Sequence, residues 1–421
     1  MIVTVLGPVE SSAVTGACSP HEHLLNSRSA STTTVTSSFH TTAESIILSN
    51  LREARRYPER FAESNRLFST DEGVQELQEF VAADGGLLFE CTAVFEGRDP
   101  NGLVEISTRT GVHVIMGASC KLQIDDVAPD VSSLETIGKE YQRQLVLGEE
   151  VLSGVQVGKS KASRVRAGFI LLRVEGTPSA GRRLLDATDR LALRAAAWAR
   201  AKTGAPIVVT FPPFPAFELV QSVAGELKSE PTSPARHTVL TGMHGGTSQS
   251  LDDQVGLLHQ GFALCFDCFG AVEWSTGPEY FPPDEESAIR VAKLIAMGFV
   301  GQVLISQAVS RRVHLSRRVE RGSILCGGFG YAHALLTVPQ RLRRLGVRDD
   351  DIRMISRDNA LRLANWYTPP PSVETPKNFL ACSWDECGKR FEPVEGSYFH
   401  KYSWVYCRIK CLRAHRDTGF D

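Results

Sequence analysis

The 421-residue sequence lacks a strong charge imbalance, a long apolar run and an N-terminal export signal. Its formal net charge is −2, so it has no global attraction to nucleic acid or to an anionic membrane. No apolar run approaches the roughly 20 residues of a membrane-spanning helix. The opening MIVTVLGPVE lacks the basic and apolar segments of a secretory signal. We therefore expect a soluble cytoplasmic protein; the sequence contains no more specific address, and association with the cytoskeleton stays open.

The composition does support a large folded core. Apolar residues make up 42% of the chain and charged residues 22%, which excludes a disordered or fibrous protein. Ten cysteines in an intracellular chain of this size argue against a disulfide framework. Six of them are scattered, but four lie within the last 40 residues, and this clustering predicts a local metal site.

Short β-branched runs alternate with longer amphipathic segments along most of the chain. Near-continuous apolar runs are typical of parallel strands that are covered on both faces. Together with a first strand before His21, they predict eight strand–helix units and hence an α/β (β/α)8 TIM barrel over residues 1–367. The expected strands after the first are 86–94, 112–118, 166–174, 206–211, 237–243, 262–270 and 302–307.

Helical periodicity is clearest between these strands, at residues 72–86, 182–204 and 284–298. Gly86, Gly204 and Gly298 stand where a glycine commonly ends a helix. Residues 349–367 predict a closing helix, and the Ser/Thr-rich residues 26–45 predict a long mobile loop. Consecutive prolines in residues 368–376 favour an extended linker, followed by a separate module at 377–421.

Several segments resemble one known family. These are TVLGPVESSAVTGACSPHEHLL, ADGGLLFECTAVFEGRDP, TGVHVIMGA, GFALCFDCFG and CGGFGYAHALLTVPQRLRRLGV, in this order along the chain. They are similar to the phosphotriesterase-related proteins of the amidohydrolase superfamily. The resemblance implies two divalent metals at the barrel mouth, held by a His-x-His after strand 1, a bridging Glu or modified Lys on strand 4, a His on strands 5 and 6, and an Asp on strand 8.

Only the His-x-His of that implied ligand set is present, as His21 and His23. Two imidazoles fall short of the three protein ligands of a catalytic zinc site, and two cations cannot lie close together without a bridging anion. We therefore assign no catalytic residues in the barrel and expect only a vestigial metal site at His21 and His23. The other family positions hold residues without a good ligand atom, namely Leu172, Thr210, Gly242 and Ala308.

Two nearby residues keep a single-metal site open as an alternative. Glu175 lies three residues beyond Leu172, and His244 lies two residues beyond Gly242. A shift of two keeps the same face of a strand, whereas a shift of three reverses it.

Two other motifs have simple interpretations. Cys265 and Cys268 have CxxC spacing, but extended spacing places them on opposite faces of a strand, so core packing is expected. A basic run usually forms a solvated face, yet the run here could also bind an acidic partner. Its arginines are Arg311, Arg312, Arg317, Arg318 and Arg321.

The C-terminal module contains two thiol pairs, Cys382-x4-Cys387 and Cys407-x3-Cys411. Two such pairs predict a closed structural zinc site, similar to a treble-clef or MYND-type finger. His415 is an alternative ligand and His400 a weaker one. The numbers of basic and acidic residues in 377–421 are nearly equal, which does not favour binding to nucleic-acid phosphates. The aromatic residues of this module suit a contact with a protein.

The leading hypothesis is thus a catalytically inactive barrel that acts as a protein scaffold or assembly subunit with a zinc finger for protein contacts. The first alternative is a hydrolase of amide, ester or phosphotriester bonds that uses one metal. The second alternative is a nucleic-acid-binding finger protein.

Overall fold

A computed structural model describes residues 1–27, 45–67, 69–120, 131–150, 164–179, 182–212, 215–230, 234–244, 249–271, 275–276, 279–316, 318–320, 323–325, 328–368, 380–391, 398–401 and 404–418. Most of the loop expected at 26–45 and of the linker expected at 368–376 lies outside the described residues. The chain forms two compact units, Met1–Tyr367 and Thr368–Asp421. In the part of the chain that is described, no helix is long and apolar enough to cross a bilayer.

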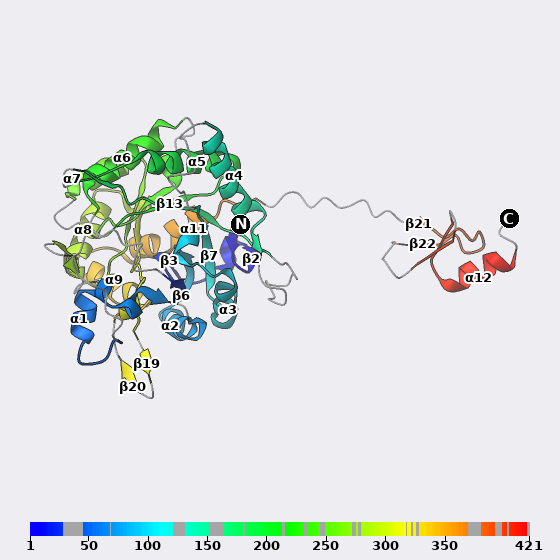
Figure 1. The fold of residues 1–421 in the computed structure, drawn as a ribbon, viewed down its shortest axis with the longest axis horizontal. Helices are drawn as coiled ribbons and strands as arrows, with labels where there is room; N and C mark the ends of the chain where they lie inside the picture. Colours follow the sequence, from blue (N-terminus) through cyan, green and yellow to red (C-terminus); the bar gives the residue numbers. More distant parts are fainter. Residues whose placement is uncertain are drawn as a thin grey trace. The chain divides into compact units, whose positions relative to one another are not determined.

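Eight parallel strands form the centre of the first unit, which confirms the predicted (β/α)8 barrel (Figure 1). Their spatial order follows the sequence from β3 to β18 without a crossover. The strands are β3 (Ala17–Glu22), β6 (Gly85–Glu90), β7 (His113–Ala118), β10 (Phe169–Arg173), β13 (Ile207–Thr210), β14 (Thr238–Leu240), β15 (Ala263–Phe266) and β18 (Val303–Ile305).

Helices surround the strands in Figure 1, each following its strand along the chain. They are α1 (Leu51–Arg56), α2 (Thr70–Ala82), α3 (Pro100–Thr110), α4 (Val131–Val146), α5 (Ala187–Thr203), α6 (Phe217–Ser229), α7 (Leu251–His259), α8 (Asp284–Ala296) and α9 (His333–Arg344). The predicted closing helix is also present, as α10 (Asp349–Arg353), a π-helical turn at Met354–Asp358 and α11 (Asn359–Ala364).

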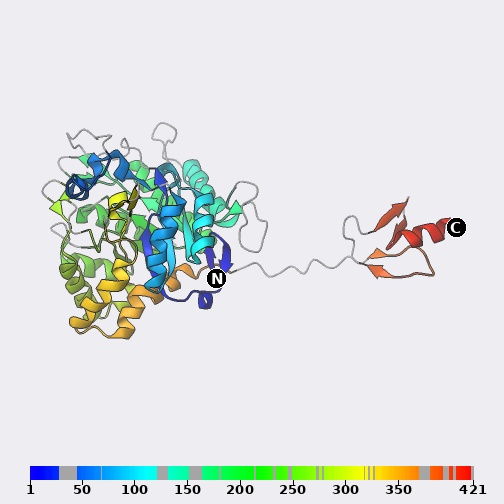
Figure 2. The same cartoon turned by 90° about the horizontal axis from the view of Figure 1, so that it is seen from below.

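Strand alternation separates the apolar residues into two layers. Ile170 and Leu172 pack in the layer between the strands and the helices. Phe169 and Leu171 belong to the barrel interior, together with side chains such as Cys265. Residues of α11 join this interior cluster and close one end of the barrel. Figure 2 shows the N-terminus and the orange α11 region near that end.

The last and first strands are joined by side-chain and loop contacts rather than by a regular ladder. The backbone N–H of Ala308 donates to the carbonyl of His21, and that of His23 donates to the carbonyl of Val309. The buried carboxylate of Glu22 accepts from the N–H groups of Gln307 and Val309 at 3.0 and 2.7 Å. These bonds fix His21 and His23 relative to the segment after β18.

The three glycine predictions have different outcomes, and Gly298, with a φ of 91°, directly follows the C-cap Met297 of α8 as expected. Gly204 ends α5 with a φ of 85°, as expected. Gly86 does not end a helix: α2 is capped at Ala83, and Gly86 lies inside β6. A Cβ at Gly86 would come within 1.8 Å of the Thr15 carbonyl oxygen, so this glycine permits close approach of two backbone segments.

The second unit contains two short hairpins and one helix. Hairpin β21 (Leu380–Ala381) with β22 (Arg390–Phe391) presents the first cysteine pair, and β23 (Phe399–Lys401) pairs with β24 (Trp404–Tyr406). Helix α12 spans Ile409–Asp417 and contains Cys411.

Candidate active site at the barrel mouth and a four-cysteine cluster

His21 and His23 lie at the carboxyl end of β3, and both imidazoles are buried. Their rings meet edge to face with centroids 5.5 Å apart. His21 Nδ1 lies 2.5 Å from Asp267 Oδ2. Because an ionised carboxylate only accepts hydrogen bonds, His21 donates from Nδ1, and when the ring is neutral its lone pair is on Nε2.

His23 is held in the same tautomer through a short relay. Its Nδ1 lies 3.0 Å from Thr92 Oγ1, and the Thr92 hydroxyl donates its proton to Glu90. The Thr92 oxygen therefore accepts from His23 Nδ1, which again places the lone pair on Nε2. Burial raises the pKa of Glu90 to about 7, although hydrogen bonds from Thr92 and Leu24 oppose the rise.

Asp267 connects three parts of the mouth. Its carboxylate accepts from the backbone N–H of Gly242 at 3.0 Å and faces His244 Nδ1 at 3.9 Å, besides its bond to His21. Burial would raise the pKa of Asp267, but hydrogen bonds and charge interactions with His21 and His244 outweigh it and hold the pKa well below its usual value. Asp267 is therefore ionised at neutral pH.

The sequence interpretation missed Asp267, although a signal was present. Side chains alternate across a strand, and Cys265 faces the barrel interior. Asp267 is two residues further and shares that face. Cys268 lies beside it, with Sγ 3.6 Å from Asp267 Oδ1, so Cys268 belongs to the mouth and is not simply packed in the core as expected.

The family positions without ligand atoms have structural roles. Leu172 packs outward, and Arg173 follows it at the end of β10 and forms ion pairs with Glu96 and Glu175. Thr210 donates to the Leu172 carbonyl at 3.3 Å. Ala308 has a φ of 50°, a strained conformation for alanine. The N–H of Ala308 bonds the carbonyl of His21.

The substitute metal ligands and the arginines of the basic run mostly have partners within the barrel unit. Glu175 Oε1 accepts from Arg173 Nε at 2.9 Å, whereas His244 lies beside Asp267. Arg311 donates to Asn65, and Arg312 pairs with Glu72; these two guanidinium groups therefore bind within the barrel unit. Arg318 begins a short strand, β19 (Arg318–Glu320), and Arg317 and Arg321 lie outside the described residues.

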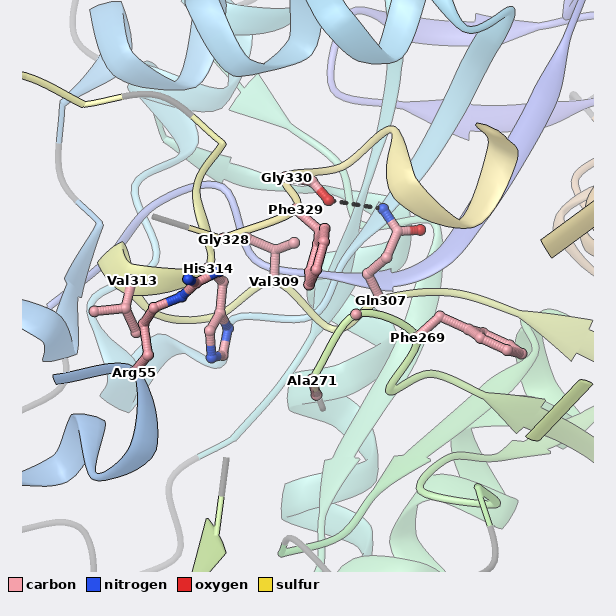
Figure 3. Close-up of a pocket in the computed structure, with 11 residues that line it drawn as sticks. Arg55, Phe269, Ala271, Gln307, Val309, Val313, His314, Gly328, Phe329 and Gly330 are labelled. Carbon is pink, nitrogen blue, oxygen red and sulfur yellow. Dashed lines mark hydrogen bonds between the residues drawn. The ribbon is translucent and has the colours of Figure 1, made fainter. Parts of the chain in front are cut away.

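A small pocket with a volume of about 50 Å3 lies beside the segment that follows β18 (Figure 3). It lies between the segments that follow β15 and β18, and Gln307 and Val309 form part of its wall. The same segment is bonded to the backbone of His21 and His23. The remaining lining residues are Arg55, Phe269, Gly270, Ala271, Val313, His314, Gly328, Phe329 and Gly330.

The donor set at the mouth fits one divalent cation and does not fit a bridged pair. His21, His23 and His244 are all buried at this mouth, and ligand atoms of His244, Asp267 and Cys268 lie within 4.8 Å of one another; a catalytic zinc site normally has three protein ligands. Asp267 and Thr92 orient two of the rings, as partners of ligating histidines usually do. A second cation would need a bridging anion at the end of β10, where Leu172 points away and the Arg173 guanidinium is positive.

Four thiols converge in the second unit. The sulfur atoms of Cys382, Cys387, Cys407 and Cys411 all lie within 4.8 Å of one another. Cys407 Sγ is 3.7 Å from Cys387 Sγ and 3.8 Å from Cys411 Sγ. Tetrahedral zinc with Zn–S bonds of about 2.3 Å requires sulfurs about 3.8 Å apart. The backbone N–H of Lys389 lowers the pKa of Cys387 to about 7, which favours the thiolate form that a metal binds.

His415 is not part of this cluster, which corrects its place as an alternative ligand. Its Nδ1 lies 3.0 Å from the Tyr406 hydroxyl, and its ring stacks on Trp404 with centroids 4.4 Å apart. His415 therefore packs in the small core of the module. His400 pairs with Val405 across the second hairpin.

A (β/α)8 barrel with polar side chains gathered at the carboxyl ends of its strands is the architecture of a large class of enzymes. Residues 1–364 match the model of the phosphotriesterase family, and the chain belongs to this family, as its motifs indicated. Residues 377–421 match the Vms1-associating treble clef domain.

Curated relatives include the N-acetyltaurine hydrolases of Rattus norvegicus and Homo sapiens. The rat protein is 26% identical over 85% of this chain and 96% of its own length, and the human protein is 25% identical over 75% and 84%. These hydrolases contradict our expectation of an inactive scaffold. His244, which kept the single-metal alternative open, lies at this mouth beside Asp267, a residue that the sequence interpretation missed.

Solved structures agree on the fold. A resiniferatoxin-binding protein from Rhodobacter sphaeroides aligns with a TM-score of 0.67 and 26% identity, covering 86% of this chain and 94% of that chain. A lactonase from Listeria monocytogenes aligns with a TM-score of 0.61 and 16% identity, covering 87% and 99%.

Proposed function

We propose that the barrel is a metal-dependent hydrolase of an amide or ester bond that uses one divalent cation held by His21, His23 and His244. The observation that carries the proposal is the burial of His21 and His23 at the barrel mouth, with the Nδ1 atom of each ring held by a buried partner. The N-acetyltaurine hydrolases among its relatives favour an N-acyl amide as the substrate.

The chain's own residues hold and orient the reacting groups. A cation bound there would lower the pKa of a water and polarise the scissile carbonyl. Asp267 holds the His21 ring at Nδ1 and faces His244 Nδ1 at 3.9 Å, and its own ionised state balances positive charge in the buried mouth. Thr92 and Glu90 hold the His23 ring.

We also propose that Cys382, Cys387, Cys407 and Cys411 hold a structural zinc ion and that the module contacts a protein. The sulfur spacing and the treble-clef match support the zinc ion. The exposed Ile409 of α12 supports a protein contact.

The test combines metal analysis with hydrolysis of N-acetyltaurine and of an ester panel. The proposal expects two metal ions per chain of the wild-type protein. His23→Ala should retain only one of them, and its hydrolysis rate should be at least a hundredfold lower. His259→Ala, at an exposed position on α7, is the matched control and should retain both. Hydrolysis that persists in His23→Ala at the wild-type rate would refute the proposal.

A further inference from the structure

Three metal-ligand side chains of different chemistry converge on the part of the barrel mouth that follows β14 and β15. They are His244, Asp267 and Cys268, and one ligand atom of each lies within 4.8 Å of the other two. His244 and Asp267 are buried, whereas Cys268 is half-buried, so the cluster is shielded but can be reached from solvent. Among the described residues, the only other cluster of this kind is that of the four module cysteines.

The fold holds these three residues in fixed positions. β14 and β15 are neighbouring parallel strands, and beyond β14 the N–H of Met243 donates to the Cys265 carbonyl at 3.1 Å. The His244 ring packs on Phe281 with centroids 4.9 Å apart. Ligands held on rigid strand ends need little rearrangement to bind a cation.

The two carboxylate oxygens of Asp267 face different groups. Oδ2 lies 2.5 Å from His21 Nδ1, whereas Oδ1 lies 3.6 Å from Cys268 Sγ and 3.9 Å from His244 Nδ1. The N–H of Gly242 donates to both oxygens. A tetrahedral zinc ion separates a carboxylate oxygen from a thiolate sulfur by about 3.6 Å and from an imidazole nitrogen by about 3.4 Å. Oδ1 and Sγ already have this separation, and His244 would need to approach Oδ1 by about 0.5 Å.

The thiol of this cluster determines which cations it can bind. Thiolates bind zinc and similar soft or borderline cations, whereas Mg2+ and Ca2+ prefer oxygen ligands. Burial and the neighbouring Asp267 carboxylate raise the pKa of the Cys268 thiol well above its usual value, so a cation that binds there must displace the thiol proton to the solvent. The cost of displacing this proton weakens the site, and we expect it to fill only when cation is added in excess.

From this geometry we infer that His244, Asp267 and Cys268 form a second position for a zinc-like cation at the barrel mouth. A neutral imidazole has one lone pair, so His244 can bind a cation at this position or together with His21 and His23, and not at both. The two positions should therefore compete for His244. Only this competition rests on the proposed hydrolase function; the second position itself does not.

Co2+ titration of the full chain, with its cysteine module first loaded with zinc, tests this inference. A Co2+–thiolate bond absorbs in the near ultraviolet, and thiolates select zinc, so the zinc of the module stays in place. In His23→Ala, which lacks the competing position, excess Co2+ should produce this absorption, and added Mg2+ should not reduce it. His23→Ala/Cys268→Ser should lose the absorption. The matched control His23→Ala/Cys120→Ser, which changes another half-buried cysteine of the barrel unit, should retain it.

The wild-type chain separates this inference from the hydrolase proposal. Its Co2+–thiolate absorption should be weaker than that of His23→Ala, because His244 then also serves His21 and His23. Equal absorption in the two proteins would support the position at Cys268 and contradict the ligand set of the proposed hydrolase. His23→Ala/Cys268→Ala provides a second test if the serine variant does not fold. No thiolate absorption in His23→Ala, or the same absorption after Cys268 is replaced, would overturn the inference.

Discussion

At the scale of single residues, Asp267 determines how the mouth can work. It contacts His21, Gly242 and Cys268 and faces His244, so one carboxylate connects three strand ends. A metal-ligating histidine depends on the partner of its other nitrogen for orientation and basicity. The loss of a conventional ligand on strand 8 therefore does not by itself make the mouth inert.

Asp267→Asn should lower the affinity of the barrel for Co2+ or Zn2+ by about 10- to 100-fold, because an amide cannot hold His21 Nδ1–H as a carboxylate does. Calorimetric titration of the full chain, with its cysteine module first loaded with zinc, measures this change. Asp252→Asn changes an exposed carboxylate on α7 and should not alter the affinity. An unchanged metal affinity in Asp267→Asn would show that Asp267 does not support metal binding at the mouth.

Glu90 predicts a pH dependence of barrel stability. Its pKa is raised from 4.5 to about 7, so the folded barrel favours the protonated form, and this stabilisation is complete below pH 4.5 and is lost as pH rises through 7. A shift of this size corresponds to about 3 kcal/mol. The Gln side chain in Glu90→Gln does not titrate, so this position no longer contributes a pH dependence to the stability of the variant.

The stability of Glu90→Gln relative to wild type should therefore increase by up to about 3 kcal/mol between pH 5 and pH 8. Denaturant unfolding of both proteins in excess chelator measures the difference without a contribution from barrel metal. Parallel pH profiles would mean that Glu90 is already ionised in the folded barrel at pH 5.

At the scale of elements, the closure between β3 and β18 depends on Glu22. Its carboxylate accepts from two buried backbone N–H groups and from the Ser19 and Ser306 hydroxyls. Glu22→Ala leaves those donors without an acceptor, at about 1–3 kcal/mol for each buried group. We expect a loss of at least about 3 kcal/mol in the free energy of barrel unfolding.

Denaturant titration, monitored by tryptophan fluorescence, measures that loss. Glu105→Ala, at an exposed position on α3, is the control. The control should change stability by about 0.5 kcal/mol or less. Glu22→Gln retains one acceptor oxygen and should lie between the two. A Glu22→Ala protein as stable as the control would show that the strands close without this carboxylate.

The elements were more predictable than the site, for a physical reason. Parallel strands buried on both faces leave long apolar runs that can be recognised one segment at a time, and all eight were found. The pairing of His21 with Asp267 joins residues that are 246 positions apart, and no local pattern contains it. Counting alternate residues from Cys265 would have placed Asp267 inward, but only the closed barrel shows which histidine it meets.

The resemblance to known hydrolases led to the wrong functional conclusion because each ligand position of the family was compared only with the residue at the same position in this sequence. Leu172 and Ala308 do lack ligand atoms, as predicted. The structure shows that neither position projects a conventional ligand, since Leu172 faces the helices and Ala308 has a positive φ. The donors instead come from Asp267, just after β15, a strand to which the family pattern assigned no ligand, and from His244, two residues beyond the position expected on the sixth strand.

At the scale of the whole molecule, the barrel and the cysteine module have different sources of stability. The barrel has an extensive apolar core, whereas the buried cluster of the described module consists of Cys382, Tyr406 and Cys411. A segment of this size cannot fold on so small a core without a staple. Folding of the module should therefore depend on metal, and folding of the barrel should not.

Removing metal from the full chain with a strong zinc chelator should abolish hydrogen-exchange protection in residues 404–418, while protection in barrel strands such as β10 and β13 persists. Cys407→Ser should produce the same loss without a chelator, because three thiolates do not complete the tetrahedral site. Cys120→Ser, which changes a cysteine in the barrel unit, is the control and should leave the module protected. If the module kept its protection after metal removal and in Cys407→Ser, the four converging sulfurs would be a packing cluster, and stacking of Trp404 on His415 would have to hold the module together.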